Sequence, residues 1–341
     1  MGFIINRYKA QNYTTLFNQE TGSFIRIEDQ GASEPFWCHF GPELMDISIT
    51  NWCDLGCNFC YKGSNENGIH MALGDYEMIL KQASKMKVSQ IALGGGNPNQ
   101  HPDFVKILEL TREKYNIVPS YTTNGKGLSN EVIRSTEKHC GAVAVSAYDP
   151  FINMELAIKK LNLNQIRTNI HFLLTSKSID TAISWLTSPP EFFEAINAII
   201  FLTYKPVGYS PSDKLLANKH SEIRLFFDLI SEHDYVKIGF DSCTISGISK
   251  FLDVNPVFVE CCEAGRFSLY ISEDLKIYPC SFMINRIPGT RLTENNLQKV
   301  WRLSPEFHSI RNKIKTNDCG KCNIYDLCQG GCPVFPEINY C

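Results

Sequence analysis

Three cysteines with the spacing C-x3-C-x2-C are the residues of this 341-residue chain whose types and spacing point most directly to chemistry: Cys53, Cys57 and Cys60. They follow an apolar run at 45–50 that reads as a buried strand, so we expect them on the loop leaving its C-terminal end. Three thiolates can bind three irons of a four-iron, four-sulfur cluster and leave the fourth iron without a protein ligand. A zinc loop is the alternative, but zinc sites usually take paired C-x2-C knuckles.

Strand-like and helix-like segments alternate from residue 45 onward. Candidate strands lie at 45–50, 90–95, 118–123, 142–147, 166–174 and 198–204, with a further strand at 235–240. Helical periodicity fills the gaps; Ile79, Ala83 and Met86, for example, share one face. Such alternation with short links predicts an α/β fold with a parallel sheet. Six strand–helix units are too few for a closed eight-stranded barrel.

The cysteine motif resembles that of the radical S-adenosylmethionine (SAM) enzymes. The resemblance implies a partial (β/α)6 barrel, similar to part of a TIM barrel, with its active site at the C-terminal ends of the strands. It also implies that SAM binds the open iron and is cleaved reductively to a 5′-deoxyadenosyl radical, which abstracts a substrate hydrogen. Phe59 is then expected to cover the adenine ring, and Tyr61 is a further expected cofactor contact.

A glycine run at the end of the second strand resembles the motif with which the family binds the SAM amino group. Gly94, Gly95 and Gly96 would let the backbone approach a ligand closely. Asn97 replaces the usual Glu; its carbonyl oxygen can accept a hydrogen bond but brings no charge. A plain tight turn is the alternative. The resemblance implies further cofactor contacts at Thr123, Ser146, Asn169 and Leu202, although core packing explains Leu202 equally well.

Two residues are candidates for catalysis. His171 lies two residues from Asn169 on one face of a strand, so it could contact substrate from inside the barrel, or it could be a satisfied core histidine. Asp241 ends the strand at 235–240 and is our candidate for the general base; a structural cap or a salt bridge is the alternative role.

The C-terminal part of the chain is rich in cysteine. A hairpin at 267–271 and 276–279 and two helical stretches, the second capped by Ser304-Pro305, precede a C-x2-C-x5-C-x3-C run. This arrangement resembles the SPASM domain, which carries two auxiliary four-iron clusters. Leu275 stands where that hairpin usually has glycine, which we interpret as a changed turn. Zinc ribbons are the alternative.

The resemblance implies two auxiliary ligand sets. The outer cluster is assigned to Cys319, Cys322, Cys328 and Cys341, and the inner cluster to Cys262, Cys280 and Cys332. The fourth inner ligand is Cys243 or Cys261, and we favour Cys243 because it follows a strand end. Outside these sets, Cys140 and the Cys38-His39 pair are expected to serve packing. The chain thus divides into an N-terminal β-hairpin extension at 1–44, a radical SAM partial barrel at 45–242 and a SPASM domain at 243–341.

Composition restricts the function. A net charge of −3 gives no footprint for nucleic acid or an anionic membrane, and no apolar run is long enough to span a bilayer. The N-terminus lacks the features of a signal peptide, and the 14 cysteines are clustered as for metal binding, so we expect a reducing, anaerobic cytoplasm.

The resemblance favours a maturase that oxidatively modifies a ribosomally made peptide (RiPP) by a crosslink, a thioether or backbone excision. Alternatives are formylglycine formation, as in anaerobic sulfatase maturases, an oxidoreductase acting on a small molecule, and an iron–sulfur electron carrier. Ser281 disfavours the sulfatase reading, since those enzymes have a catalytic Asp there. The residues before the first barrel strand lack the helices of the family's leader-binding domain. We therefore expect a separate leader-recognition or accessory protein, or direct recognition of the core peptide in the barrel, besides a flavodoxin- or ferredoxin-type reductant.

Overall fold

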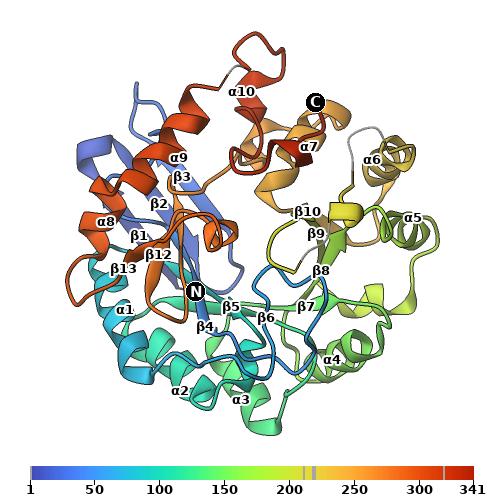
Figure 1. The fold of residues 1–341 in the computed structure, drawn as a ribbon, viewed down its shortest axis with the longest axis horizontal. Coiled ribbons are helices and arrows are strands. Elements are labelled where there is room, and N and C mark those ends of the chain that lie inside the picture. Colours follow the sequence, from blue (N-terminus) through green and yellow to red (C-terminus); the bar gives the residue numbers. More distant parts are fainter. Residues whose placement is uncertain (1, 210–211, 217–219, 318) are drawn as a thin grey trace.

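A ten-stranded sheet runs through the protein. The computed structural model describes residues 2–209, 212–216, 220–317 and 319–341. The sheet has the order β10-β9-β8-β7-β6-β5-β4-β11-β12-β13, and its strands from β4 to β10 are parallel neighbours (Figure 1). These strands are β4 Leu44–Thr50, β5 Gln90–Gly95, β6 Val118–Thr123, β7 Val143–Ala147, β8 Thr168–Leu174, β9 Ala198–Thr203 and β10 Lys237–Phe240. Each predicted strand is confirmed to within two residues at either end.

Helices cover the outer face of this curved sheet (Figure 1). They are α1 Leu73–Lys85, α2 Phe104–Glu109 with a π-helical turn at Leu110–Lys114, α3 Asn130–His139, α4 Ile152–Leu163, α5 Ile179–Thr187 and α6 Glu222–Glu232. Their apolar stripes meet the outward side chains of the strands; Met45 and Ile47 of β4 and Ile79 of α1 are fully buried. Each such burial stabilises the fold by roughly 1.5–3 kcal/mol.

The inner face of the sheet, which points away from these helices, carries smaller and more polar side chains. Because side chains alternate along a strand, burial in β8 alternates residue by residue, with Asn169, His171 and Leu173 partly exposed on the inner face. The inner face also carries Asp46 and Ser48 in β4, Ala92 and Gly94 in β5, and Ser120 and Thr122 in β6. The polar character of this face suits the binding of a polar ligand rather than the filling of a barrel with large apolar side chains.

The cysteine-rich part extends the barrel sheet. β11 Ser268–Ile271 pairs parallel with β4 and antiparallel with β12 Lys276–Tyr278, which pairs with β13 Thr290–Arg291. The predicted hairpin is confirmed, and it lies directly beside the first barrel strand. Four helices complete this part: α7 Ile245–Phe251, α8 Leu297–Leu303, α9 Pro305–Lys315 and α10 Tyr325–Cys328. Ser304 and Pro305 begin α9 as predicted, but the Ser304 hydroxyl makes no capping hydrogen bond.

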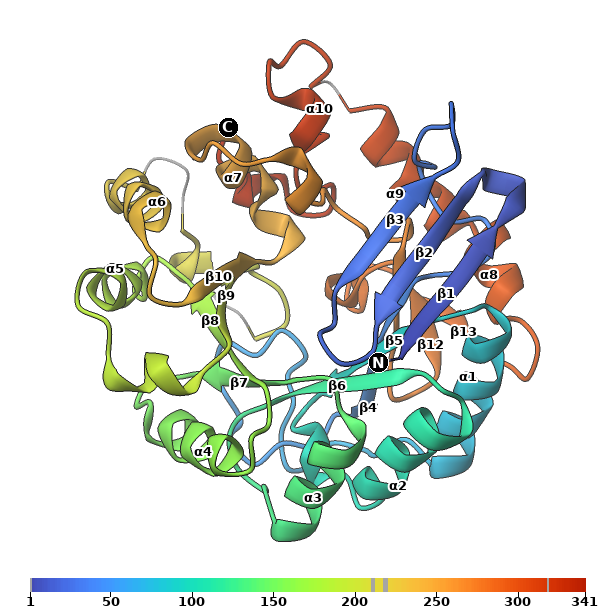
Figure 2. The same ribbon diagram turned by 180° about the vertical axis from the view of Figure 1, so that it is seen from behind.

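The N-terminal hairpin is part of a three-stranded antiparallel sheet, β1 Phe3–Tyr8, β2 Tyr13–Asn18 and β3 Phe24–Glu28 (Figure 2). The sequence analysis missed β1. Asn6 donates a hydrogen bond to the carbonyl of Lys87 at 3.0 Å, and Arg167 donates one to the carbonyl of Glu20 at 2.6 Å. Lys87 and Arg167 precede β5 and β8, so this sheet contacts the barrel at the N-terminal ends of its strands.

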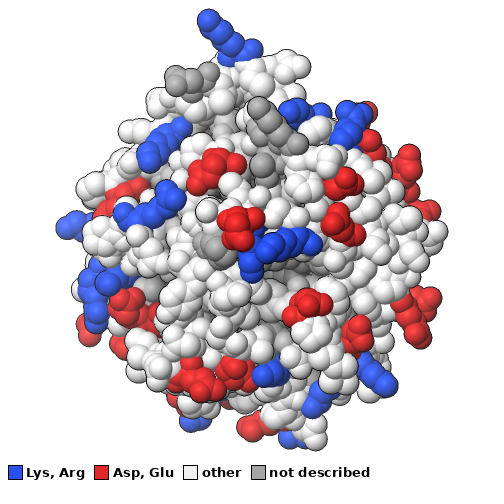
Figure 3. Space-filling model, turned by 45° about the vertical axis from the view of Figure 1, so that its right-hand side comes forward, with Lys and Arg blue, Asp and Glu red and all other residues white. Residues whose placement is uncertain are grey.

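Short 3-10 helices occur at Lys9–Gln11, Pro98–Gln100, Glu191–Ala195, Ser212–Lys214, Ser242–Thr244, Pro256–Phe258, Ser281–Met283 and Pro336–Ile338. None of the helices in the described ranges has the length and apolar character to cross a membrane. On the face drawn in Figure 3, acidic and basic side chains are interspersed without a large patch of one sign, in keeping with the small net charge.

Candidate active site

The three motif cysteines lie on the loop that leaves the C-terminal end of β4, as predicted. Backbone hydrogen bonds from Asn51 to Ile69 (2.8 Å) and from Cys53 to Asn65 (3.0 Å) fold the loop back on itself. All three thiols are partly exposed. Burial, and then the charges of the Cys60 and Cys53 thiolates, raise the pKa of Cys57 to about 11. The thiols are thus close enough to repel one another as thiolates, a repulsion that bound iron would relieve.

A zinc ion and a four-iron cluster require different separations of their thiolate ligands. In the part of the chain that the structure describes, no three His, Cys, Asp or Glu side chains converge as the ligands of one metal ion would. The thiolates of a zinc site all bind one atom, at about 2.3 Å. Thiolates that hold a four-iron cluster each bind a different iron, so they can stand further apart.

The end of β6 fixes this loop from the side. The Asn124 amide donates to the Cys53 sulfur at 3.8 Å and to the Asp54 carboxylate at 3.2 Å. Gln100 donates to the other Asp54 oxygen at 3.3 Å, and Lys126 forms an ion pair with it at 3.4 Å. Asp54 is therefore a fixed acceptor that ties the cysteine loop to the neighbouring strand ends.

The three glycines that end β5 differ in their surroundings. A Cβ atom on Gly95, whose φ is +115°, would lie 1.9 Å from the Thr50 carbonyl oxygen, and one on Gly96 would lie 1.9 Å from the Trp52 carbonyl oxygen. Both glycines therefore allow close packing of the cysteine loop, rather than direct approach of a ligand. A Cβ on Gly94 would meet no atom within 4 Å. Gly94, on the inner face, is the position of the three that a ligand could approach.

The side-chain amide and carbonyl groups of Asn97 form hydrogen bonds within the protein. Its side chain is fully buried, and its carbonyl oxygen accepts hydrogen bonds from the Thr123 hydroxyl and the Asn124 backbone N–H, both at 3.1 Å. Its amide donates to Gln100 at 2.8 Å and to the Lys126 carbonyl at 3.2 Å. Contrary to expectation, neither Asn97 nor Thr123 presents a free polar group to a ligand, because their hydrogen bonds connect the ends of β5 and β6.

The end of β7 lies beside the motif cysteines. Burial, together with the charges of the motif thiolates, raises the pKa of Tyr148 to about 12. The Phe59 and Tyr148 rings are 5.1 Å apart, and the Lys214 ammonium lies 4.6 Å from the Phe59 ring. Sequence reasoning missed Tyr148 and Lys214, although Tyr148 is part of the strand-end segment that supplied Ser146.

The Tyr61 ring faces the cysteine-rich part rather than the inner face of the sheet. It lies 4.7 Å from the ring of Phe282, and burial raises its pKa well above the usual value. Tyr61 thus connects the motif loop to the segment after Cys280. This packing differs from the cofactor contact expected from the sequence.

The inner-face residues of β8 and β9 lie at different heights. Asn169, near the start of β8, accepts a hydrogen bond from Asn197 at 2.8 Å, so it is at the end of the strand far from the cysteine loop. A contact between Asn169 and the cofactor stays a prediction. His171 lies two residues further along β8, with Nδ1 3.4 Å from the Thr122 hydroxyl. Burial lowers the pKa of His171 to about 4. Leu202 is partly exposed near the C-terminal end of β9.

Asp241 is held by four hydrogen bonds. One carboxylate oxygen accepts from the backbone N–H and hydroxyl of Thr203 at 3.2 and 3.1 Å and from the Thr244 hydroxyl at 2.9 Å. The other forms a 2.5 Å ion pair with Lys205, whose side chain is 1% exposed. The structure thus shows the alternative role that the sequence left open for Asp241, a salt bridge with Lys205 together with hydrogen bonds from Thr203 and Thr244.

Four C-terminal cysteines approach one another, each from a different segment. A hydrogen bond with Cys332, followed by burial, raises the pKa of Cys243 well above its usual value. Burial, followed by the charges of Cys243 and Cys280, raises the pKa of Cys262 well above its usual value. Cys261 points elsewhere; the Arg266 guanidinium donates to its sulfur at 2.6 Å. This geometry favours Cys243 over Cys261 as the fourth member of the set.

The last cysteines form a second group. Burial is the largest cause of the raised pKa of Cys328, and the charges of Cys341 and Cys319 add to it. Cys322 shares a turn with Cys319, since its N–H donates to the Cys319 carbonyl at 2.8 Å. Cys38 and Cys140 serve packing as predicted; Cys38 is fully buried beside Tyr8 and Tyr13.

Sequence reasoning also missed two buried lysines at this end of the sheet. Lys205 lies near the thiolates of Cys243 and Cys332, whose charges, with Asp241, favour its ammonium form, although burial opposes it. Lys62 pairs with Glu273 at 2.5 Å and donates to Tyr270 at 2.8 Å. Nothing in the local sequence marks either lysine, because both partners lie far away along the chain.

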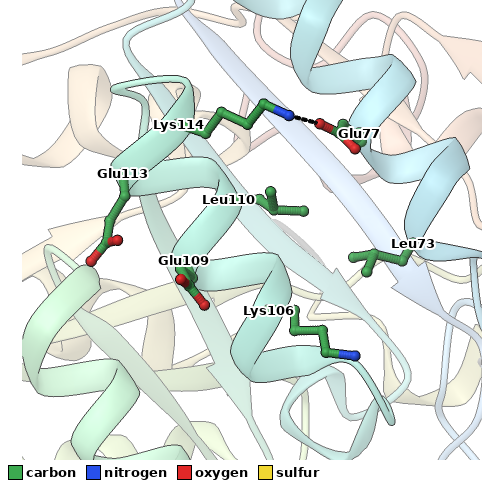
Figure 4. Close-up of a pocket in the computed structure, with 7 residues that line it drawn as sticks. All are labelled: Leu73, Glu77, Lys106, Glu109, Leu110, Glu113 and Lys114. Carbon is green, nitrogen blue, oxygen red and sulfur yellow. Dashed lines mark hydrogen bonds and ion pairs between the residues drawn. The ribbon is translucent and has the colours of Figure 1, made fainter.

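A surface hollow of about 530 Å³ lies elsewhere, between α1 and α2 (Figure 4). Its lining is Leu73, Glu77, Lys106, Glu109, Leu110, Glu113 and Lys114. An ion pair between Lys114 and Glu77 crosses it. These residues belong to the outer helical layer, on the opposite side of the sheet from the inner face, so the hollow is not part of the candidate active site.

A parallel sheet whose first barrel strand leads into a C-x3-C-x2-C loop defines the class of radical SAM enzymes. Residues 47–147 match the family model described as Radical SAM superfamily. The protein is a radical SAM enzyme, and the cofactors of that class are SAM and a four-iron, four-sulfur cluster.

Comparison with individual proteins extends the similarity beyond the barrel. The chain is 22% identical over 311 residues to the mycofactocin maturase MftC of Mycobacterium ulcerans (strain Agy99), covering 85% of this chain and 83% of MftC. Its fold is similar to that of Streptococcus suis SuiB bound to S-adenosylmethionine, with a TM-score of 0.74, 18% identity, and coverage of 97% of this chain and 94% of SuiB. Native anSMEcpe with bound AdoMet and Cp18Cys peptide matches with a TM-score of 0.63, 18% identity, and 87% and 90% coverage.

Proposed function

We propose that this protein is a radical SAM maturase that modifies a ribosomally made peptide oxidatively. The observation that carries the proposal is that the similarity to the maturase MftC spans 85% of the chain, so it includes the cysteine-rich part as well as the barrel. Structures of SuiB with the precursor peptide SuiA and of anSMEcpe with a peptide have the same fold, which supports a peptide as the substrate class here.

Three four-iron clusters are proposed. Cys53, Cys57 and Cys60 would hold the cluster that binds SAM. The inner auxiliary cluster would be held by Cys243, Cys262, Cys280 and Cys332, and the outer one by Cys319, Cys322, Cys328 and Cys341. SAM and its cluster, when bound, supply hydrogen-atom abstraction from a substrate carbon.

The protein's own residues prepare these sites. Asn124 and Asp54 hold the motif loop against β6, and Gly94 keeps the inner face of β5 free of side chains. The β4–β11 pairing holds the hairpin that leads to Cys280 against the first barrel strand. The Lys205 ammonium, buried beside Cys243 and Cys332, offsets negative charge there.

The product is proposed to be a crosslink, a thioether or an excised backbone segment. These are net oxidations, so an electron acceptor is required, and the auxiliary sites supply a candidate. We also propose that a flavodoxin- or ferredoxin-type protein delivers the first electron. A separate small protein that presents the peptide is part of the same proposal.

The test is to purify the protein without oxygen, reduce it with dithionite and add SAM. Formation of 5′-deoxyadenosine is expected, and co-expression with a small peptide encoded beside its gene should change that peptide's mass. Cys53→Ala serves as the control and should produce neither signal. SAM cleavage without modification of any neighbouring peptide would refute the peptide substrate while leaving the enzyme class intact.

A further inference from the structure

A buried ion pair joins the motif loop to the cysteine-rich part of the chain. Lys62, two residues after the last motif cysteine, lies 2.5 Å from the carboxylate of Glu273, which is in the turn between β11 and β12. The Lys62 side chain is 2% exposed and the Glu273 side chain 11%. The two residues are 211 positions apart in the sequence, so the pair forms only when the hairpin is packed against the barrel.

All three N–H groups of the Lys62 ammonium have an acceptor. Besides Glu273, they reach the Tyr270 hydroxyl of β11 at 2.8 Å and the Ser48 hydroxyl of β4 at 3.1 Å. Ser48 in turn donates to Glu273 at 2.7 Å, and both Ser48 and Tyr270 are buried. Because hydrogen bonds are directional, this network holds the ammonium at one position, which apolar packing alone does not do.

The residue directly after the last motif cysteine also contacts the cysteine-rich part. The Tyr61 ring lies 4.7 Å from the ring of Phe282, in the short helix that follows β12. The connection after β9 adds a third contact, since the backbone N–H of Tyr209 donates to the Cys60 carbonyl at 3.2 Å. The segment that begins at Cys60 is thus held mainly by side chains from outside the motif loop.

The first motif cysteine is held by different residues. The backbone N–H of Cys53 donates to the Asn65 carbonyl at 3.0 Å, and its sulfur accepts from the Asn124 amide, at the end of β6, at 3.8 Å. The barrel and the motif loop itself therefore fix Cys53, whereas the cysteine-rich part fixes the segment after Cys60. It follows that the relative position of these two cysteines depends on how the β11–β12 hairpin packs against β4.

We propose that Lys62 is a positioning residue for SAM cleavage: its ion pair with Glu273 makes the β11–β12 hairpin part of the structure that sets the arrangement of the motif cysteines. The cysteine-rich part then has a role in the first cluster site besides holding auxiliary clusters. Lys62 takes no part in bond breaking and acts through the motif loop. The inference rests on the radical SAM class of the enzyme and not on the identity of its substrate.

The first test measures the motif loop without SAM or peptide. Amide hydrogen exchange of the anaerobic protein follows the backbone N–H of Gly63, which donates to the Cys60 carbonyl at 3.1 Å. Lys62→Met keeps the length of the side chain but removes its charge, and it should speed this exchange about tenfold. Lys276→Met is the matched control, because Lys276 pairs with Asp274 in the same hairpin at 2.9 Å but both side chains are 41% exposed. Equal exchange in Lys62→Met and the parent overturns the proposal.

The second test adds SAM and dithionite and measures 5′-deoxyadenosine formation per bound iron. Lys62→Met should form it about ten- to a hundredfold more slowly, because small displacements near a reacting group have effects of this size. Lys62→Arg keeps a cation and should recover part of the rate, while Lys276→Met should match the parent. A parental rate in Lys62→Met overturns the proposal.

A double variant separates positioning from a general loss of stability. Lys62→Met alone leaves the Glu273 carboxylate buried without a counter-charge, which lowers stability. Adding Glu273→Gln removes that charge, so the melting temperature should return toward that of the parent, while 5′-deoxyadenosine formation stays slow because the ion pair is still absent. If the double variant regains both, the unpaired charge caused the loss and the proposal is overturned. A parent that cleaves SAM but modifies no peptide refutes the proposed function and leaves these comparisons valid.

Discussion

Leu275 adopts a φ of 62° in the turn between β11 and β12. This left-handed conformation is the one that glycine adopts readily, so the turn keeps a backbone that suits glycine although leucine occupies it. The expectation of a changed turn is therefore wrong. The conformation costs leucine about 1–2 kcal/mol, and its side chain is 93% buried in the core, which offsets that cost.

Leu275→Gly should lower the free energy of unfolding by about 1–3 kcal/mol, because lost burial outweighs the relieved strain. Gln165 has a similar φ of 53° but is exposed, so Gln165→Gly isolates the backbone effect and should be neutral or slightly stabilising. Denaturant unfolding of both variants under anaerobic conditions measures the difference. A Leu275→Gly protein that is more stable than its parent would contradict this account of the turn.

Other residues show where sequence reasoning stops. The motif cysteines and the auxiliary cysteines carry their chemistry in type and spacing, so they could be listed from the sequence. The environments of Asn97 and Asp241 depend on partners such as Lys126 and Lys205, which fold back from other segments.

At the scale of elements, the parallel strands and their helices were predictable because their hydrophobic periodicity is local. The pairing of β4 with β11 was not, since more than two hundred residues separate the two strands and neither carries a local mark of its partner. The neighbours of the glycines that end β5 could not be predicted from the sequence either. Their sequence indicates close approach of the backbone to something, and the structure identifies the cysteine loop as the neighbour of Gly95 and Gly96.

The end of β5 offers a matched pair of substitutions. Gly95→Ala should displace the Thr50 carbonyl and disturb the motif loop, so we expect lower stability and loss of iron from the first cluster site. Gly94→Ala adds its methyl group in open space on the inner face, so stability and iron content should stay near those of the parent, while SAM binding weakens about tenfold. Anaerobic titration of SAM and iron analysis distinguish the two. Equal effects of both substitutions would contradict the different roles of the two glycines.

At the scale of the whole molecule, cysteines from distant segments form separate groups. The motif cysteines lie on one loop after β4, whereas the auxiliary cysteines come from segments after β10 and β12 and from the C-terminal end. Replacing Cys53, Cys57 and Cys60 together by Ala should abolish 5′-deoxyadenosine formation and leave about two-thirds of the iron and sulfide in place. Iron and sulfide analysis of the anaerobic protein tests this. Stoichiometric zinc in the parent, or SAM cleavage by the triple variant, would falsify the assignment.

One buried arginine connects the three parts of the chain. Arg26 in β3 is 7% exposed, and its guanidinium lies 2.7 Å from Glu43, which precedes β4, and 3.0 Å from Glu263, which precedes β11. It also stacks 3.9 Å from the centre of the Phe267 ring. The N-terminal sheet is thus anchored to both the barrel and the cysteine-rich part through a single cation.

Arg26→Met should leave the buried carboxylate of Glu43 and the partly exposed carboxylate of Glu263 without this counter-charge, at a cost of about 3–5 kcal/mol, or on the order of 5–10 °C in Tm. Arg224→Met is the matched control, because its pair with Asp228 is largely exposed and should contribute less than about 1 kcal/mol. Adding Glu43→Gln to Arg26→Met should restore part of the loss, since it removes one of the uncompensated charges. Thermal unfolding of the anaerobic proteins decides the matter. If Arg26→Met costs no more than Arg224→Met, the N-terminal sheet is held by its apolar contacts rather than by this cation.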